Sequence, residues 1–144
     1  MITIDQVLND KGREVATILS TSTLHEVSRI LDTSKIGAVV SLTPDGKICG
    51  VLSERDIVRQ VARVGAEALS MTVEDAMTRS VITAEPHESV EEGLTRMTDR
   101  RIRHLPIVSD DQLVGIVSIG DLVKWKIAHT ELEAEAMKAY IASG

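Results

Sequence analysis

Aromatic residues are almost absent from this sequence, which has 144 residues but only one Trp, one Tyr and no Phe. Apolar residues nevertheless make up 43% of the chain, so a hydrophobic core must be built from aliphatic side chains and methionine. Cysteine is equally scarce. Cys49 stands alone, which excludes an internal disulfide and is typical of proteins from a reducing compartment.

Positive charge and long apolar runs are lacking too. The formal net charge is −6 at pH 7, which argues against general binding of nucleic acids because such binding needs a basic surface. No apolar run approaches the ~20 residues that a membrane-spanning helix requires, and no targeting leader opens the chain. We therefore expect a cytoplasmic protein that associates with neither nucleic acid nor membrane.

Motifs for catalysis and for metal binding are also missing. Gly115 and Gly120 have the separation found in a phosphate-binding loop, but Asp121 follows them in place of lysine. Ser118 does not form a nucleophile elbow, because no glycine stands two residues before it. The four histidines lack the spacing of a metal site. We expect a protein that is not an enzyme and that has neither a metal nor a catalytic cofactor.

An internal repeat is the feature that the chain does contain. Residues 50–56 and 115–121 both read glycine, two apolar residues, serine, two variable residues and aspartate, followed by an apolar helical run. These two junctions lie 65 positions apart, and upstream matches lie 66 apart. The chain therefore consists of two copies of a unit of roughly 60 residues. We predict domains at residues 1–68 (first copy) and 69–144 (second copy).

Each copy has the pattern of a strand, a helix, a hairpin of two strands and a second helix, which predicts an α/β (α+β) fold. Thr23 with Glu26, and Ser89 with Glu92, are capping boxes that mark the start of the first helix in each copy. The predicted strands span residues 15–18, 38–42 and 47–52 in the first copy and 81–84, 105–108 and 113–117 in the second. The apolar residues at 2–8 are expected to pack against the first copy.

The last helix is predicted to begin near Gly120 and to reach about Ile141, well beyond its counterpart in the first copy. An apolar stripe follows one of its faces at three- and four-residue spacing and comprises Leu122, Trp125, His129, Leu132 and Ala136. Two interpretations remain open. The stripe packs within the chain, or it forms a dimer contact, because the single Trp and Tyr lie on this extension.

The two junctions also allow two interpretations. Ser53 and Ser118 are candidate N-caps, and Asp56 and Asp121 then lie in the first helical turn, where a carboxylate favours the helix dipole. Alternatively, an aspartate beside a hydroxyl at the end of a strand can bind the cis-diol of a ribose. The residues of the junctions alone do not decide between these roles.

The doubled order of motifs resembles a tandem pair of cystathionine-β-synthase (CBS) domains, also called a Bateman module. The resemblance covers residues 5–127, and its matching stretches are 15–17, 50–56, 81–83, 89–92, 101–108 and 113–121. It implies two pseudo-symmetric β-α-β-β-α repeats packed sheet against sheet. It also implies two clefts between them that bind adenosine-containing ligands.

The resemblance assigns roles to particular residues. It implies that Asp56 and Asp121 take the ribose hydroxyls with the help of Ser53 and Ser118. It places Thr17 and Thr83 near the ribose or phosphate, and surrounds the adenine with Val15, Ile36, Val81 and Ile102.

Phosphate requires positive charge, which the two copies supply differently. Arg103 and His104 suit a phosphate in the second copy, although a solvated basic stretch is the alternative. In the first copy Arg55 lies inside the junction, where the second copy has Gly120. We therefore expect two chemically unequal clefts.

The predicted function is that of a regulatory module that binds an adenine nucleotide reversibly and without catalysis. AMP is the first expectation, followed by ADP, ATP or NAD. We expect a homodimer and a regulated protein in trans, because no effector domain is recognisable in the chain. The alternatives are an interaction module with empty clefts and, less favoured, an enzyme that hydrolyses nucleotides.

Overall fold

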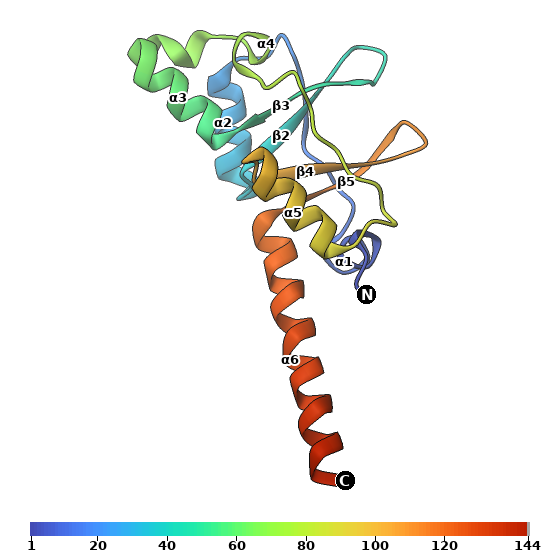
Figure 1. Ribbon diagram of the computed structural model, residues 1–144. Helices are drawn as coiled ribbons and strands as arrows, with labels where there is room; N and C mark the ends of the chain where they lie inside the picture. The colour runs from blue at the N-terminus through green and yellow to red at the C-terminus, as the bar shows by residue number, and fades with distance from the viewer. Residues whose placement is uncertain (144) are drawn as a thin grey trace. The chain divides into compact units, whose positions relative to one another are not determined.

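The computed structural model describes residues 1–143 and divides into two compact units. Unit 2 is the continuous segment Val15–Ile82, whereas unit 1 combines Met1–Glu14 with the chain from Thr83 onwards (Figure 1). Each unit mixes helices with a small sheet, which confirms the predicted α/β fold class. The units exchange their leading segments, and a division of the sequence repeats after residue 68 stays a prediction.

Unit 2 is built on a three-stranded sheet of order β1-β2-β3. Its elements are β1 (Thr17–Leu19), α2 (Leu24–Ser34), β2 (Ala38–Leu42), β3 (Ile48–Ser53), α3 (Glu54–Val64), the 3-10 helix η1 (Gly65–Ser70) and α4 (Val73–Ala76). Strand β1 is parallel to β2, and β2 is antiparallel to β3. Leu24 and Val27 of α2 pack with Val39 and Leu52 of the sheet, and all four side chains are fully buried.

Unit 1 contains the antiparallel pair β4 (His104–Ser109) and β5 (Gln112–Ser118). Its helices are α1 (Ile4–Lys11), α5 (Val90–Arg100) and α6 (Ile119–Ser143). The strand predicted at residues 81–84 is wrong, because only Ala84 forms a bridge, parallel to Ile107. The carbonyl of Thr83 accepts a hydrogen bond from the Arg96 side chain on α5.

The N-terminal helix α1 does not pack against the first copy as expected. It lies beside β5 in unit 1 (Figure 1), where Ile4, Val7 and Leu8 are fully buried. The backbone N–H of Ile4 donates to the carbonyl of Glu88 at 2.8 Å. The short helix α4 takes the matching place in unit 2, where the N–H of Val73 donates to the carbonyl of Ser22 at 2.8 Å. Each unit is therefore completed by the leading segment of the other copy.

Helix α6 confirms the prediction of a long final helix, but only its first turns are packed. Leu122 is fully buried, Trp125 and His129 are half-buried, and the side chain of Leu132 is 69% exposed. The ammonium of Lys126 bonds the carboxylate of Glu91 on α5 at 2.9 Å and so ties the middle of α6 to unit 1. Within residues 1–143, no helix has both the length and the apolar character that crossing a membrane requires.

Candidate functional site

In unit 2, at the junction between β3 and α3, both carboxylate oxygens of Asp56 accept hydrogen bonds from neighbouring residues. The backbone N–H of Ser53 donates to Oδ2 of Asp56 at 2.9 Å, and the Ser53 hydroxyl donates to the same oxygen at 3.2 Å. The other oxygen, Oδ1, accepts from Nη1 of Arg59 at 3.1 Å. The Asp56 side chain is only 8% exposed. Oδ2 therefore caps the start of the helix, as the capping interpretation describes, while Oδ1 is held in the ion pair with Arg59.

In unit 1 the junction between β5 and α6 forms a reciprocal capping box. The N–H of Ser118 donates to Oδ2 of Asp121 at 2.8 Å, and the N–H of Asp121 donates to the Ser118 hydroxyl at 3.1 Å. Lys11, at the end of α1, donates to the same Oδ2 at 2.7 Å. The Asp121 side chain remains 28% exposed, and its Oδ1 takes part in none of these contacts. Capping thus leaves one oxygen of this aspartate for another donor.

The carboxyl of Asp121 is held in its ionised form. Its partial burial would raise the pKa, but the hydrogen bonds from Lys11 and from the Ser118 backbone outweigh that effect. The pKa of Asp121 is consequently below its ordinary value. At neutral pH this group is a hydrogen-bond acceptor only, which suits a ligand that offers hydroxyl hydrogens.

The basic residues predicted for the second copy lie at the same junction. His104 is the first residue of β4 and stands opposite Ser118 in the strand register. The carbonyl of Arg103 accepts from the N–H of Ile119 at 2.8 Å, and the exposed Arg103 side chain is adjacent to it. Unit 1 therefore gathers two basic residues, a serine and a part-exposed aspartate around the start of α6.

The other predicted residues of unit 2 are less closely gathered. Ile36 lines an open hollow of about 580 Å³ together with Gly37 and the first turn of α3, including Glu54. Arg55 is exposed on that turn, and Thr17 is exposed on β1. Three apolar candidates lie outside regular elements and are half-buried, namely Val15, Val81 and Ile102.

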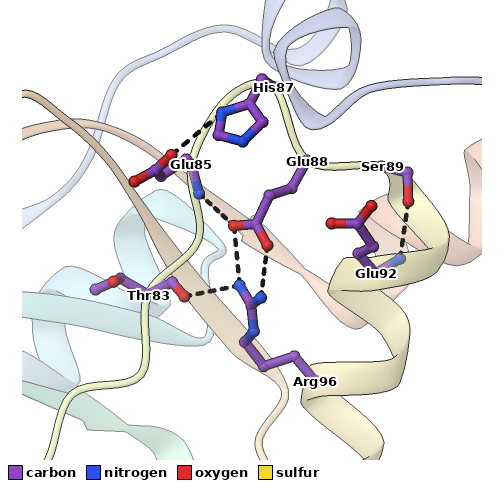
Figure 2. Close-up of polar contacts among 7 residues, drawn as sticks. All are labelled: Thr83, Glu85, His87, Glu88, Ser89, Glu92 and Arg96. Atoms are coloured by element: carbon purple, nitrogen blue, oxygen red, sulfur yellow. Dashed lines mark hydrogen bonds and ion pairs between the residues drawn. The ribbon is translucent and has the colours of Figure 1, made fainter.

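Thr83 belongs to a separate cluster, which Figure 2 shows. Nη1 of Arg96 donates to the Thr83 carbonyl and to Glu88, both at 3.0 Å, while Nη2 bonds the other Glu88 oxygen at 2.5 Å. These bonds from Arg96 lower the pKa of Glu88, although partial burial acts in the opposite direction. The cluster fixes the extended segment at Thr83 against α5, a positioning contact that the sequence pattern did not indicate.

Two further residues at the junctions were missed as site residues. Arg59 lies three positions after Asp56 on α3, a helical spacing that signals an ion pair. Lys11 carries no such signal, because it lies 110 positions from Asp121. Within residues 1–143, no group of three or more His, Cys, Asp or Glu residues is placed to hold a metal ion.

Comparison with known proteins identifies the repeat. A family model described as the CBS domain matches residues 7–63 and 73–128. The CBS domain-containing protein CBSX3, mitochondrial, from Arabidopsis thaliana is 31% identical over 150 residues, which cover 99% of this chain and 73% of that protein. The CBS domain-containing protein YhcV from Bacillus subtilis is 31% identical over 109 residues, 76% of either protein.

Solved structures agree with this match. The CBS-domain containing protein ATU1752 from Agrobacterium tumefaciens has a TM-score of 0.83 at 38% identity, covering 85% of this chain and 91% of that one. The CBS domain pair of protein MJ0100, solved in complex with 5'-methylthioadenosine and S-adenosyl-L-methionine, has a TM-score of 0.80 at 26% identity. That match covers 90% of this chain and 98% of the other.

Proposed function

Because the chain belongs to the CBS domain family, we propose that it is a regulatory module that binds an adenosine-containing ligand reversibly and does no chemistry on it. The CBS pair of MJ0100 binds two such ligands, 5'-methylthioadenosine and S-adenosyl-L-methionine. The observation that carries the proposal is the Asp121 carboxylate. It is ionised, fixed in position by Ser118 and Lys11, and part-exposed with one oxygen left over.

The different contacts at the two junctions predict different affinities for a ribose in the two copies. A ribose at Asp121 gains a hydrogen bond to an oxygen that is already oriented, and no internal contact is lost. A ribose at Asp56 must displace Arg59 from a carboxylate that is 8% exposed. We therefore expect the tighter binding at Asp121, with Asp56 as the weaker second position.

AMP is the ligand that we propose, with ADP, ATP and NAD as successors. Arg103 and His104 beside the Ser118–Asp121 junction supply basic groups for a phosphate, which 5'-methylthioadenosine does not have. A ligand that prefers one conformational state stabilises that state only by its difference in affinity. At about 100 times its dissociation constant, a ligand that binds only one state contributes roughly 2.7 kcal/mol to it. We propose that a partner protein in trans binds one conformational state in preference to the other and so responds to the ligand.

Calorimetry with AMP, ADP, ATP, NAD, S-adenosylmethionine and 5'-methylthioadenosine tests the function. We expect AMP to bind, and Asp121→Ala to weaken that binding by about 10- to 100-fold, since a lost hydrogen bond to a charged group costs ~1.5–3 kcal/mol. Asp56→Ala should have a smaller effect. Asp111→Ala, in the exposed turn between β4 and β5, is the control and should bind as the wild type does.

The same experiment separates the alternatives. If none of the six ligands produces binding heat, the alternative function, an interaction module with empty clefts, is favoured. Nucleotide hydrolysis followed by chromatography, if it disappears in Asp121→Ala, would indicate an enzyme. Retained AMP affinity in Asp121→Ala would refute the assignment of the ribose to this aspartate. We also propose a cytoplasmic location, which the unpaired Cys49 supports.

We further propose a homodimer in which the outer part of α6 pairs with a second copy. Four large apolar side chains on α6 are exposed at positions of one coiled-coil seam: Val123 (39%), Ile127 (54%), Met137 (60%) and Ile141 (69%). Thr130 and Ala134 fill the remaining seam positions. Glu131 and Lys138 lie seven residues apart on the same side of the seam. When two α6 helices pair in antiparallel orientation, Glu131 of each subunit lies beside Lys138 of the partner subunit, which gives two attractive charge pairs.

Light scattering at micromolar concentration tests the homodimer. The wild type should have twice the mass of the chain, and Ile127→Glu with Ile141→Glu should reduce it to that of a monomer, because charges cannot be buried unpaired in the seam. Leu132→Glu is the matched control: Leu132 is equally exposed but faces away from the seam, so the dimer should persist. A monomeric wild type would exclude this role of α6.

A further inference from the structure

Lys11 ends α1 with its ammonium held at two acceptors of the neighbouring junction. Its Nζ donates to Oδ2 of Asp121 at 2.7 Å and to the backbone carbonyl of Ile116 on β5 at 2.9 Å. The Lys11 side chain is 31% exposed, so the ammonium lies at the surface of unit 1 rather than in its core. An isolated surface lysine has no fixed place, but a lysine with two acceptors from different residues does.

The position of Lys11 follows from a difference between the two copies. In unit 2, Val51 on the outer edge of β3 pairs with the backbone of Thr78, whose N–H donates to the Val51 carbonyl at 2.9 Å. Ile116 is the equivalent edge residue in unit 1, 65 positions later. There the chain turns away at Gly12, which has φ of 102°, and the Lys11 side chain takes the carbonyl instead. The ammonium thus replaces a strand contact of the other copy.

This arrangement leaves one donor beside one acceptor. A lysine ammonium has three N–H donors, and two of them are directed at Asp121 and Ile116. On the carboxylate, Oδ2 accepts the bonds from the Lys11 ammonium and the Ser118 backbone N–H, whereas Oδ1 takes part in neither of them. A hydroxyl group matches this pair, because its oxygen accepts a hydrogen bond while its hydrogen is donated.

We propose that Lys11 is a ligand-binding residue that, together with Asp121, recognises the 2'-hydroxyl of a ribose. The Lys11 ammonium donates to the hydroxyl oxygen, and the hydroxyl hydrogen goes to Oδ1 of Asp121. This inference rests on the proposed function and adds a residue from the leading segment of the first copy. This contact makes the site selective for a ribonucleotide, because a 2'-deoxyribose lacks the 2'-hydroxyl.

Calorimetry with AMP and 2'-deoxy-AMP on the wild type and on Lys11→Met tests the inference. Methionine keeps an apolar side chain of similar reach while removing the donors. We expect Lys11→Met to weaken the affinity for AMP about 10-fold, which is the loss expected for one hydrogen bond from a charged donor. The affinity for 2'-deoxy-AMP should fall less than twofold. Lys124→Met removes the same charge from an exposed site three residues after Asp121, and should leave both affinities unchanged.

The outcomes distinguish this inference from the proposed function. Equal weakening of both ligands would overturn the hydroxyl contact and indicate that Lys11 acts through its charge or through the placement of α1. An unchanged AMP affinity in Lys11→Met, with a large loss in Asp121→Ala, would overturn the inference alone. If the wild type gives no heat with any of the six ligands named above, the proposed function fails and this inference fails with it. Melting curves of Lys11→Met show whether the variant is folded.

Discussion

Removal of residues 1–12 should leave unit 1 unfolded, although these residues open the first copy in the sequence. Ile4, Val7 and Leu8 of α1 have no exposed surface, and each contributes about 1.5–3 kcal/mol of burial. Their combined contribution of ~5–9 kcal/mol is comparable with the total stability of a typical domain, 5–15 kcal/mol. The deletion also removes the backbone bonds from Ile4 to Glu88 and from Val90 to Ile2.

Amide hydrogen exchange gives the most direct measurement of this loss. Protection should disappear in β4, β5 and α5, while β2 and β3 of unit 2 keep more of it. The point variant Leu8→Asp should have the same effect on unit 1 without shortening the chain, because it buries an unpaired charge. Asp10→Ala, on the exposed face of the same helix, is the control and should change little. Unaltered protection of β4 and β5 in the deletion variant would contradict the packing of α1.

The behaviour of α1 shows where sequence reasoning stops. Alternating apolar positions indicated that one face of residues 2–8 is buried, and it is. The pattern contains no information on which copy covers that face, and proximity in the chain suggested the wrong one. The deciding contacts join Ile4 to Glu88 and Lys11 to Asp121, across most of the chain. Hydrophobic periodicity reports burial but not the partner.

Helix caps and hairpins were predicted more accurately, because the residues that form them lie only a few positions apart in the sequence. Thr23 and Ser89 are the N-caps of α2 and α5, as predicted, and their hydroxyls accept from the N–H groups of Glu26 and Glu92 at 3.2 and 3.0 Å. The hairpins and the helix starts at Ser53 and Ser118 follow in the same way. The strand at 81–84 is wrong because pairing is confined to one bridge, between Ala84 and Ile107, and the Thr83 carbonyl bonds the Arg96 side chain. No propensity scale includes such a contact.

The candidate site combines both cases. The repeat in the sequence identified two aspartates and two serines as equivalent, and in both junctions the serine N–H donates to Oδ2 of the aspartate. Their chemistry differs through Arg59 on one side and Lys11 on the other. One of these cations is a helical neighbour and the other comes from the opposite end of the chain. The inequality of the two aspartates is therefore a property of the folded units.

The motif glycines provide the second large effect. Gly115 on β5 lies under α1, and a Cβ atom built there would come within 2.7 Å of Cδ2 of Leu8. Gly50 on β3 has the matching place under Met77, whose Sδ would lie 2.3 Å from such a Cβ. Neither glycine has a positive φ angle, so space rather than backbone conformation requires the residue. The glycine that opens each junction is present because the leading segment of the other copy packs on it.

Gly115→Val should therefore destabilise unit 1 by about 1–3 kcal/mol or more through overpacking, measured by urea unfolding. Gly120→Ala is the control, because its Cβ would meet only Ser118 Oγ at an ordinary 3.6 Å. Alanine at position 120, inside α6, should be neutral or stabilising.

A double-mutant cycle identifies Leu8 as the cause. Leu8→Ala alone should cost about 2–5 kcal/mol, since it empties a fully buried position. In the double variant Gly115→Ala with Leu8→Ala, the new methyl group occupies part of that space, so the combined cost should fall below the sum by about 1–2 kcal/mol. Strict additivity would mean that α1 and β5 are not in contact there. A coupling of the expected size would establish that the first residue of the junction motif and the N-terminal helix form one packing unit.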